Sequence, residues 1–66
     1  MKIHNEKLLK AFKRKFKTAP VVEIEMDGER GWATYVIDDM ECEFDMGQDE
    51  LKWVSDYTFK HWEVIP

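Results

Sequence analysis

The chain reads MECEFDM from residue 40 to residue 46, and this stretch decides the fold because apolar and acidic residues alternate without a break. A period of two is typical of a strand that packs one face on a core and exposes the other to water. Residues 21–26, VVEIEM, repeat the pattern, with Glu23 and Glu25 set between apolar neighbours. Together the two stretches predict an antiparallel sheet with one apolar face and one acidic face.

Further strands are predicted on the same basis. Residues 32–37, WATYVI, are rich in β-branched and aromatic residues, which favours a strand covered on both faces or nearly so. Turns are predicted at Asp27-Gly28, running on to Gly31, and at Asp38-Asp39. We expect the last strand at residues 57–65. Residues 51–54 fit either a short strand or one helical turn, and the strand is preferred.

Upstream of the sheet, residues 5–17 have the period of an amphipathic helix. Asn5 is a candidate N-cap, and Pro20 ends the segment because proline disfavours the helical conformation of the residue before it. One apolar stripe at spacings of three and four is formed by Leu8, Leu9, Phe12 and Phe16. This stripe is expected to pack on the apolar face of the sheet.

These segments predict an α+β fold in a single domain, residues 1–66. A helix at about residues 5–17 packs on an antiparallel meander of four or five strands at about residues 21–65, in the order α-β-β-β-β. We also expect a complete small reading frame, because Met1 opens the chain and Pro66 directly follows the last expected strand.

The composition indicates a folded protein and the cellular compartment in which we expect it. The chain has 66 residues, of which 44% are hydrophobic and 36% charged, as is typical of a folded domain. So small a domain needs most of its nine aromatic residues in the core, because their burial supplies much of the stability of the fold. Cys42 is the single cysteine, so the chain forms no internal disulfide, which favours a reducing compartment. The longest run without a charge, residues 31–37, is too short for a membrane helix. We therefore expect a soluble cytoplasmic protein.

The sequence lacks the residue patterns of an active site. Cys42 lies on the apolar side of its strand without a neighbouring base, and Ser55 lies in an expected turn. His4 and His61 are far apart in the sequence and match no metal-ligand spacing. No glycine-rich phosphate loop is present. We expect no enzymatic activity, no metal and no cofactor.

Charge divides the chain into two parts. Residues 1–18 hold seven basic residues and one acidic residue, a net charge of +6, whereas residues 19–66 hold three and thirteen, a net charge of −10. The predicted acidic face combines five carboxylates from two strands that flank a third: Glu23, Glu25, Glu41, Glu43 and Asp45. Two acidic rows about 10 Å apart loosely match the regular charges of a nucleic-acid backbone.

The first hypothesis is that this acidic face binds a basic protein. The chain would then act as an inhibitor that imitates DNA in front of a nucleic-acid-binding protein, a role common among small acidic proteins of phages and mobile elements. Trp32 or Tyr35 would add an aromatic anchor, and the sequence leaves open which of them points outward. The competing interpretation is that the acids only keep an exposed sheet face soluble and discourage edge pairing.

The basic helix carries the second hypothesis, nucleic-acid binding. Its candidate face consists of Lys10, Lys13, Arg14 and Lys17. The helix lacks Asn or Gln residues suited to reading bases, and the rest of the chain would repel a polyanion. Membrane binding is not expected. A structural homodimer without a ligand is the third hypothesis.

Overall fold

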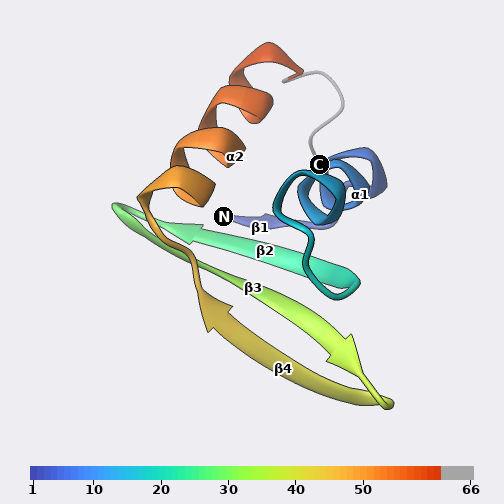
Figure 1. The fold of residues 1–66 in the computed structure, drawn as a ribbon. Helices are drawn as coiled ribbons and strands as arrows, with labels where there is room; N and C mark the ends of the chain where they lie inside the picture. Colours follow the sequence, from blue (N-terminus) through green and yellow to red (C-terminus); the bar gives the residue numbers. More distant parts are fainter. Residues whose placement is uncertain (62–66) are drawn as a thin grey trace.

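The computed structural model describes residues 1–61, which form four strands and two helices (Figure 1). In chain order the elements are β1 (Lys2–Ile3), α1 (Glu6–Phe16), β2 (Val21–Asp27), β3 (Arg30–Ile37), β4 (Met40–Asp45) and α2 (Gln48–Lys60). The strands form one sheet in the order β1-β2-β3-β4, and every neighbouring pair is antiparallel. The predicted fold class, an N-terminal helix on a four-stranded antiparallel meander, is confirmed.

The register of the strands separates the two faces of the sheet. Ile3, Ile24, Ala33 and Phe44 lie side by side across the four strands, so their side chains share one face. Three of them are fully buried, because α1 and α2 cover this inner face (Figure 1). The neighbouring row, one residue along each strand, therefore points to the opposite, outer face, which carries no helix.

Aromatic rings join the two helices to the sheet. Phe12 of α1 is fully buried, and its ring centroid lies 6.4 Å from that of Phe44 in β4 and 5.9 Å from that of Trp53 in α2. Phe16 adds a second edge-on contact with Trp53 at 5.8 Å. The apolar stripe predicted for the first helix thus forms the centre of the core.

The ends of α1 follow the sequence signals. The Asn5 side chain accepts a hydrogen bond from the Leu8 N–H at 3.0 Å, as expected of an N-cap. Lys17 adopts the left-handed conformation, with φ of 54°, and its N–H donates to the Lys13 carbonyl. The helix ends there, three residues before the predicted stop at Pro20, and Glu6–Phe16 with its two cap residues covers the predicted residues 5–17.

The C-terminal part differs from the prediction. The preference for a strand at residues 51–54 is wrong, and so is the predicted strand at Tyr57–Lys60, because one helix spans Gln48–Lys60. Residues 62–65 of that predicted strand lie outside the described residues. The fourth strand is instead β1, which precedes α1, so the order of elements is β-α-β-β-β-α.

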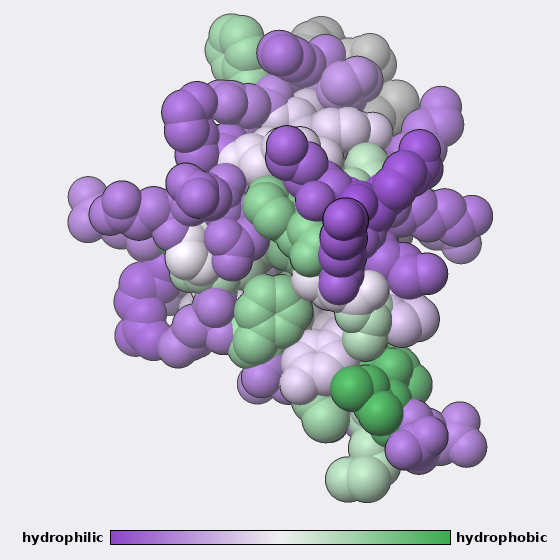
Figure 2. Space-filling model, in the orientation of Figure 1, coloured by the Kyte–Doolittle hydropathy of each residue, from purple (hydrophilic) through white to green (hydrophobic). Residues whose placement is uncertain are grey.

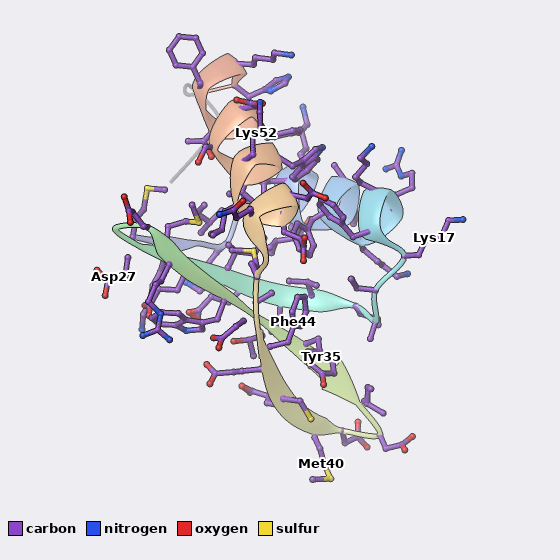
Figure 3. The ribbon with its side chains drawn as sticks, turned by 60° about the vertical axis from the view of Figure 1, so that its left-hand side comes forward. Lys17, Asp27, Tyr35, Met40, Phe44 and Lys52 are labelled. Atoms are coloured by element: carbon purple, nitrogen blue, oxygen red, sulfur yellow. The ribbon has the colours of Figure 1, made fainter. Side chains whose placement is uncertain are left out.

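The hairpin of β3 and β4 extends beyond the helices (Figure 1). Met40 lies at its far end, while Tyr35 and Phe44 lie nearer the helices (Figure 3). Asp38 and Asp39 form the two-residue turn, with φ of 51° and 64°. Positive φ at both positions is typical of the type I′ turn, whose twist matches that of the paired strands.

Candidate protein-binding face

The outer face of the sheet brings together the acidic residues predicted from the sequence. By register, Lys2, Glu25, Trp32 and Asp45 form one row across the four strands. Glu23, Thr34 and Glu43 form the next row, and Val36 lies opposite Glu41 beyond it. All five predicted acids therefore project from the same side, two from β2 and three from β4, with β3 between them.

A shallow hollow of about 600 Å³ lies on this face. It is lined by Lys2, His4, Val22, Glu23, Glu25, Trp32, Thr34, Glu41 and Glu43. Four of the five predicted acids thus border one depression, and Asp45 continues the row on β4 beside it. Glu23 and Glu25 are half-buried, whereas Glu41, Glu43 and Asp45 are exposed.

The acids on the outer face form no ion pair with a cation of residues 1–61. Within residues 1–61 the structure contains one side-chain ion pair, between Lys52 and Asp56 on α2. Lys2 stands across from Glu25 in the register without forming an ion pair in this part of the chain. The carboxylates are therefore available to an external cation.

Trp32 provides the aromatic side chain whose direction the sequence left open. It lies on the outer face between Glu25 and Asp45 and is half-buried. Tyr35 points to the inner face, where its ring centroid lies 5.7 Å from that of Phe44. An indole between carboxylates suits a guanidinium or ammonium group, because the ring face attracts a cation and the carboxylates accept its hydrogen bonds.

Two residues of the hollow were missed by sequence reasoning. Lys2 and His4 reach the outer face because β1 pairs with β2, and a strand of two residues gives almost no periodic signal. They make the β1 side of the face less acidic. The negative charge is consequently concentrated towards β4.

The basic residues predicted on the first helix also lie together. Lys10, Lys13, Arg14 and Lys17 line a shallow hollow of about 560 Å³ with Thr18. Their spacing of three and four places them on one side of α1, which packs on the inner face of the sheet. These four cations of α1 and the acidic face therefore lie on opposite sides of the sheet.

Other candidate groups do not form a site within the part of the chain that the structure describes. Cys42 is half-buried on the inner face, at the end of the sheet that the helices leave open. His61 caps α2 and stacks on Tyr57 with ring centroids 4.3 Å apart. Residues 1–61 contain no cluster of three or more side chains suited to a metal ion, and none of their helices has the length and apolar character needed to cross a membrane.

Comparison of the chain with protein-family models, curated proteins and solved structures found no significant match.

Proposed function

We propose that this chain is a non-enzymatic protein-binding module that inhibits a basic partner in the cytoplasm by covering its cationic groove with the outer face. One observation carries the proposal: Trp32 stands half-buried between Glu25 and Asp45, on a face whose acids have no ion pair within residues 1–61. Tryptophan is among the residues most enriched at the interface positions that dominate binding energy.

The spacing of the acids supports a partner that binds nucleic acid. Glu23 and Glu43 lie two strands apart, which corresponds to about 10 Å. Same-side residues along each strand repeat about every 6.8 Å. Two such rows offer a groove of Lys and Arg residues a pattern of charge resembling that of phosphates, and a chain of this kind would compete with DNA or RNA for the same groove.

The experiment is an affinity capture from a lysate of the organism that encodes the chain. The test variant combines Glu41→Gln, Glu43→Gln and Asp45→Asn. A matched control combines Glu29→Gln, Asp38→Asn and Asp39→Asn, which are exposed acids in the two hairpin turns. Both variants change the net charge from −4 to −1, so they differ only in where the charge is lost.

We expect the control variant to capture the same protein as the unmodified chain and the outer-face variant to lose it. Added duplex DNA should release the captured protein, since both would occupy one groove. Equal loss in the two variants would indicate attraction by net charge alone, and equal capture would exclude the acidic rows as the contact.

The basic side of α1 supports a second candidate, nucleic-acid binding, because its four predicted cations line a single hollow. A gel shift with duplex DNA or RNA at low ionic strength tests it. The shift should weaken on Lys13→Ala with Arg14→Ala and should fall steeply with added salt. Absence of a shift at low salt would exclude this candidate and leave the acidic face.

A further inference from the structure

The edge of the sheet at β4 is unoccupied in residues 1–61, since β4 pairs only with β3. The turn shows which residues of β4 direct their backbone N–H and C=O groups towards β3 and which direct them away. Ile37 and Met40 flank the two-residue turn, and residues in that position exchange both backbone hydrogen bonds. The Met46 N–H, six residues further on, also donates across to the Gly31 carbonyl at 2.9 Å.

Hydrogen-bonded and non-hydrogen-bonded pairs alternate along such a ladder. The even-numbered residues of β4 therefore direct their N–H and C=O groups towards β3. Glu41, Glu43 and Asp45 direct theirs away from the sheet, and we call these backbone groups the free edge. The same three residues carry the acidic side chains of β4, so they supply both the unpaired backbone groups and the negative charge of this edge.

The inner side of this edge is apolar. The hairpin carries Tyr35, Ile37, Met40, Cys42 and Phe44 on that side, a set that we call the apolar strip. Met40 is 65% exposed and Ile37 is 48% exposed, because the helices end short of the hairpin. Apolar side chains gather on the lower part of the surface, over this hairpin (Figure 2). A hollow of about 390 Å³ opens there between Thr18, Ala19 and the strip.

A second copy of the chain is a poor occupant of this edge. When two β4 strands pair, residues opposite each other must point to the same face. In a parallel pair the free-edge groups of both copies can meet only with one sheet turned over, which sets each acid opposite an apolar residue of the other copy. Every antiparallel register sets Glu41, Glu43 or Asp45 against an acid of the other copy. Like charges directly opposite each other destabilise a strand pair.

We propose that β4 captures an extended segment of the basic partner, in which Lys or Arg alternates with apolar residues, as an added strand of the sheet. The proposal rests on the function proposed above and specifies its binding mode. In the added strand the basic residues lie opposite Glu41, Glu43 and Asp45 on the outer face. The intervening apolar residues extend the apolar strip, and the backbone of the segment pairs with the free edge.

The probe is a short capped peptide in which lysine and valine alternate. The first control peptide has the same composition with its lysines and valines in two blocks. The second control is the alternating peptide methylated on every second backbone nitrogen. It is made in two versions, methylated either on the lysines or on the valines, and one of the two lacks the N–H donors that face β4. All peptides carry the same charge, so attraction to the acids alone would bind them equally.

We expect the alternating peptide to bind about ten-fold or more tightly than the blocked peptide and than the N-methylated version that lacks the donors facing β4. On binding, hydrogen exchange should slow at the backbone amides of Glu41, Glu43 and Asp45. Equal affinities, or exchange that slows elsewhere, would overturn the added strand while leaving the acidic face intact. Failure of every peptide to bind at about 1 mM and low salt would instead count against both proposals.

Two variants separate backbone pairing from charge. Glu43→Gln and Glu43→Pro both remove the carboxylate, but only proline also removes an N–H of the free edge. Because that N–H makes no bond within the sheet, proline is tolerated there as on other edge strands. The proline variant should bind the alternating peptide several-fold more weakly than the glutamine variant, and circular dichroism checks that both remain folded. Equal binding by two folded variants would contradict strand addition.

Discussion

The turn between β3 and β4 shows how single residues set the geometry of the binding face. Asp38 and Asp39 both have positive φ, a conformation that costs free energy for most residues with a side chain and that Asn and Asp tolerate best. The turn fixes the register that aligns Thr34 with Glu43 and Trp32 with Asp45. Residues outside the face thus determine which side chains meet on it.

We predict that Asp38→Asn combined with Asp39→Gly stabilises the fold by about 1 kcal/mol, because Asn-Gly is the preferred pair for a type I′ turn. Urea unfolding measures the change. The control is Asp38→Val with Asp39→Val, which should destabilise, since β-branched residues tolerate positive φ poorly. A loss of stability in the Asn-Gly variant would contradict the turn type.

Gly31 is a second decisive residue, where β3 meets the start of α2. A Cβ at this position would lie 2.7 Å from both the Leu51 Cδ2 and the Met46 Cε atoms. We predict that Gly31→Ala destabilises the fold by about 1 kcal/mol, at the low end for overpacking because both atoms in its way are the ends of flexible side chains. In a double-mutant cycle by urea unfolding, Leu51→Ala should recover part of that loss. Strictly additive effects would show that the two positions do not touch.

At the scale of elements, α1, β2 and β4 could be predicted because each has a clear period, and β3 because it is rich in β-branched and aromatic residues. The alternation in residues 21–26 and 40–46 also predicted which acids share a face. Besides β1, the element that the sequence analysis missed is α2. Its apolar positions Leu51, Val54 and Tyr57 follow a helical spacing, but the β-branched and aromatic residues after position 56 favour a strand.

A signal that could have identified α2 was present in its charges. Asp49 and Glu50 lie in the first turn, Lys60 lies in the last, and Lys52 with Asp56 forms a pair four residues apart. The Gly47 N–H donates to the Glu50 carboxylate at 3.2 Å, which further supports the start of the helix. The strand β1 could not be predicted, because two residues carry no period.

The Lys52–Asp56 pair permits a prediction about pH. The hydrogen bond from Lys52 holds the pKa of the Asp56 carboxyl below its usual value, and the same hydrogen bond raises the pKa of Lys52. The contribution of Asp56 to stability is therefore present above the ordinary Asp pKa of about 4 and is lost as the pH falls through its lowered value. The contribution of Lys52 is present below its ordinary pKa of about 10.4 and is lost as the pH rises through its raised value.

Because both side chains are largely exposed, we expect Asp56→Asn to lower the urea midpoint at pH 7 only slightly. The decrease should be smaller at high salt, which screens the pair. Well below the Asp56 pKa the two proteins should have the same midpoint. A larger difference at acid pH than at neutral pH would contradict the assigned pair.

The core depends on contacts between elements. Phe12 is fully buried and touches rings from β4 and α2, so Phe12→Ala should cost about 3–5 kcal/mol. A domain of this size has about that much stability, and we expect the variant to be unfolded at 37 °C by circular dichroism. The matched control is Phe59→Ala on α2, which is 84% exposed and should unfold like the parent. Equal effects of the two changes would contradict the packing.

At the scale of the whole molecule, the sheet separates a basic side on α1 from the acidic outer face. The sequence predicted the two groups of charges and most of the acidic site. It could not predict that Trp32 faces the acids, because residues 32–37 do not alternate, nor that Lys2 and His4 join the face. The direction of Trp32 follows only from its pairing with Glu25 and Asp45.

The charge separation has a measurable cost. Unpaired acids on one face repel each other, so neutralising Glu41, Glu43 and Asp45 together should raise the urea midpoint at low salt. The gain should shrink as added salt screens the repulsion. A fall in the midpoint would mean that these acids stabilise the fold, and a structural role would then replace the binding role.

The most direct test of the acidic outer face is a nuclear magnetic resonance titration of the nitrogen-15-labelled chain with a short arginine-rich peptide. The indole N–H of Trp32 should shift together with the amides of β2, β3 and β4, while the indole of Trp53, which packs between the helices, should stay in place. Shifts confined to α1 or α2, or a Trp32 signal that does not move at low salt, would contradict the proposed binding face.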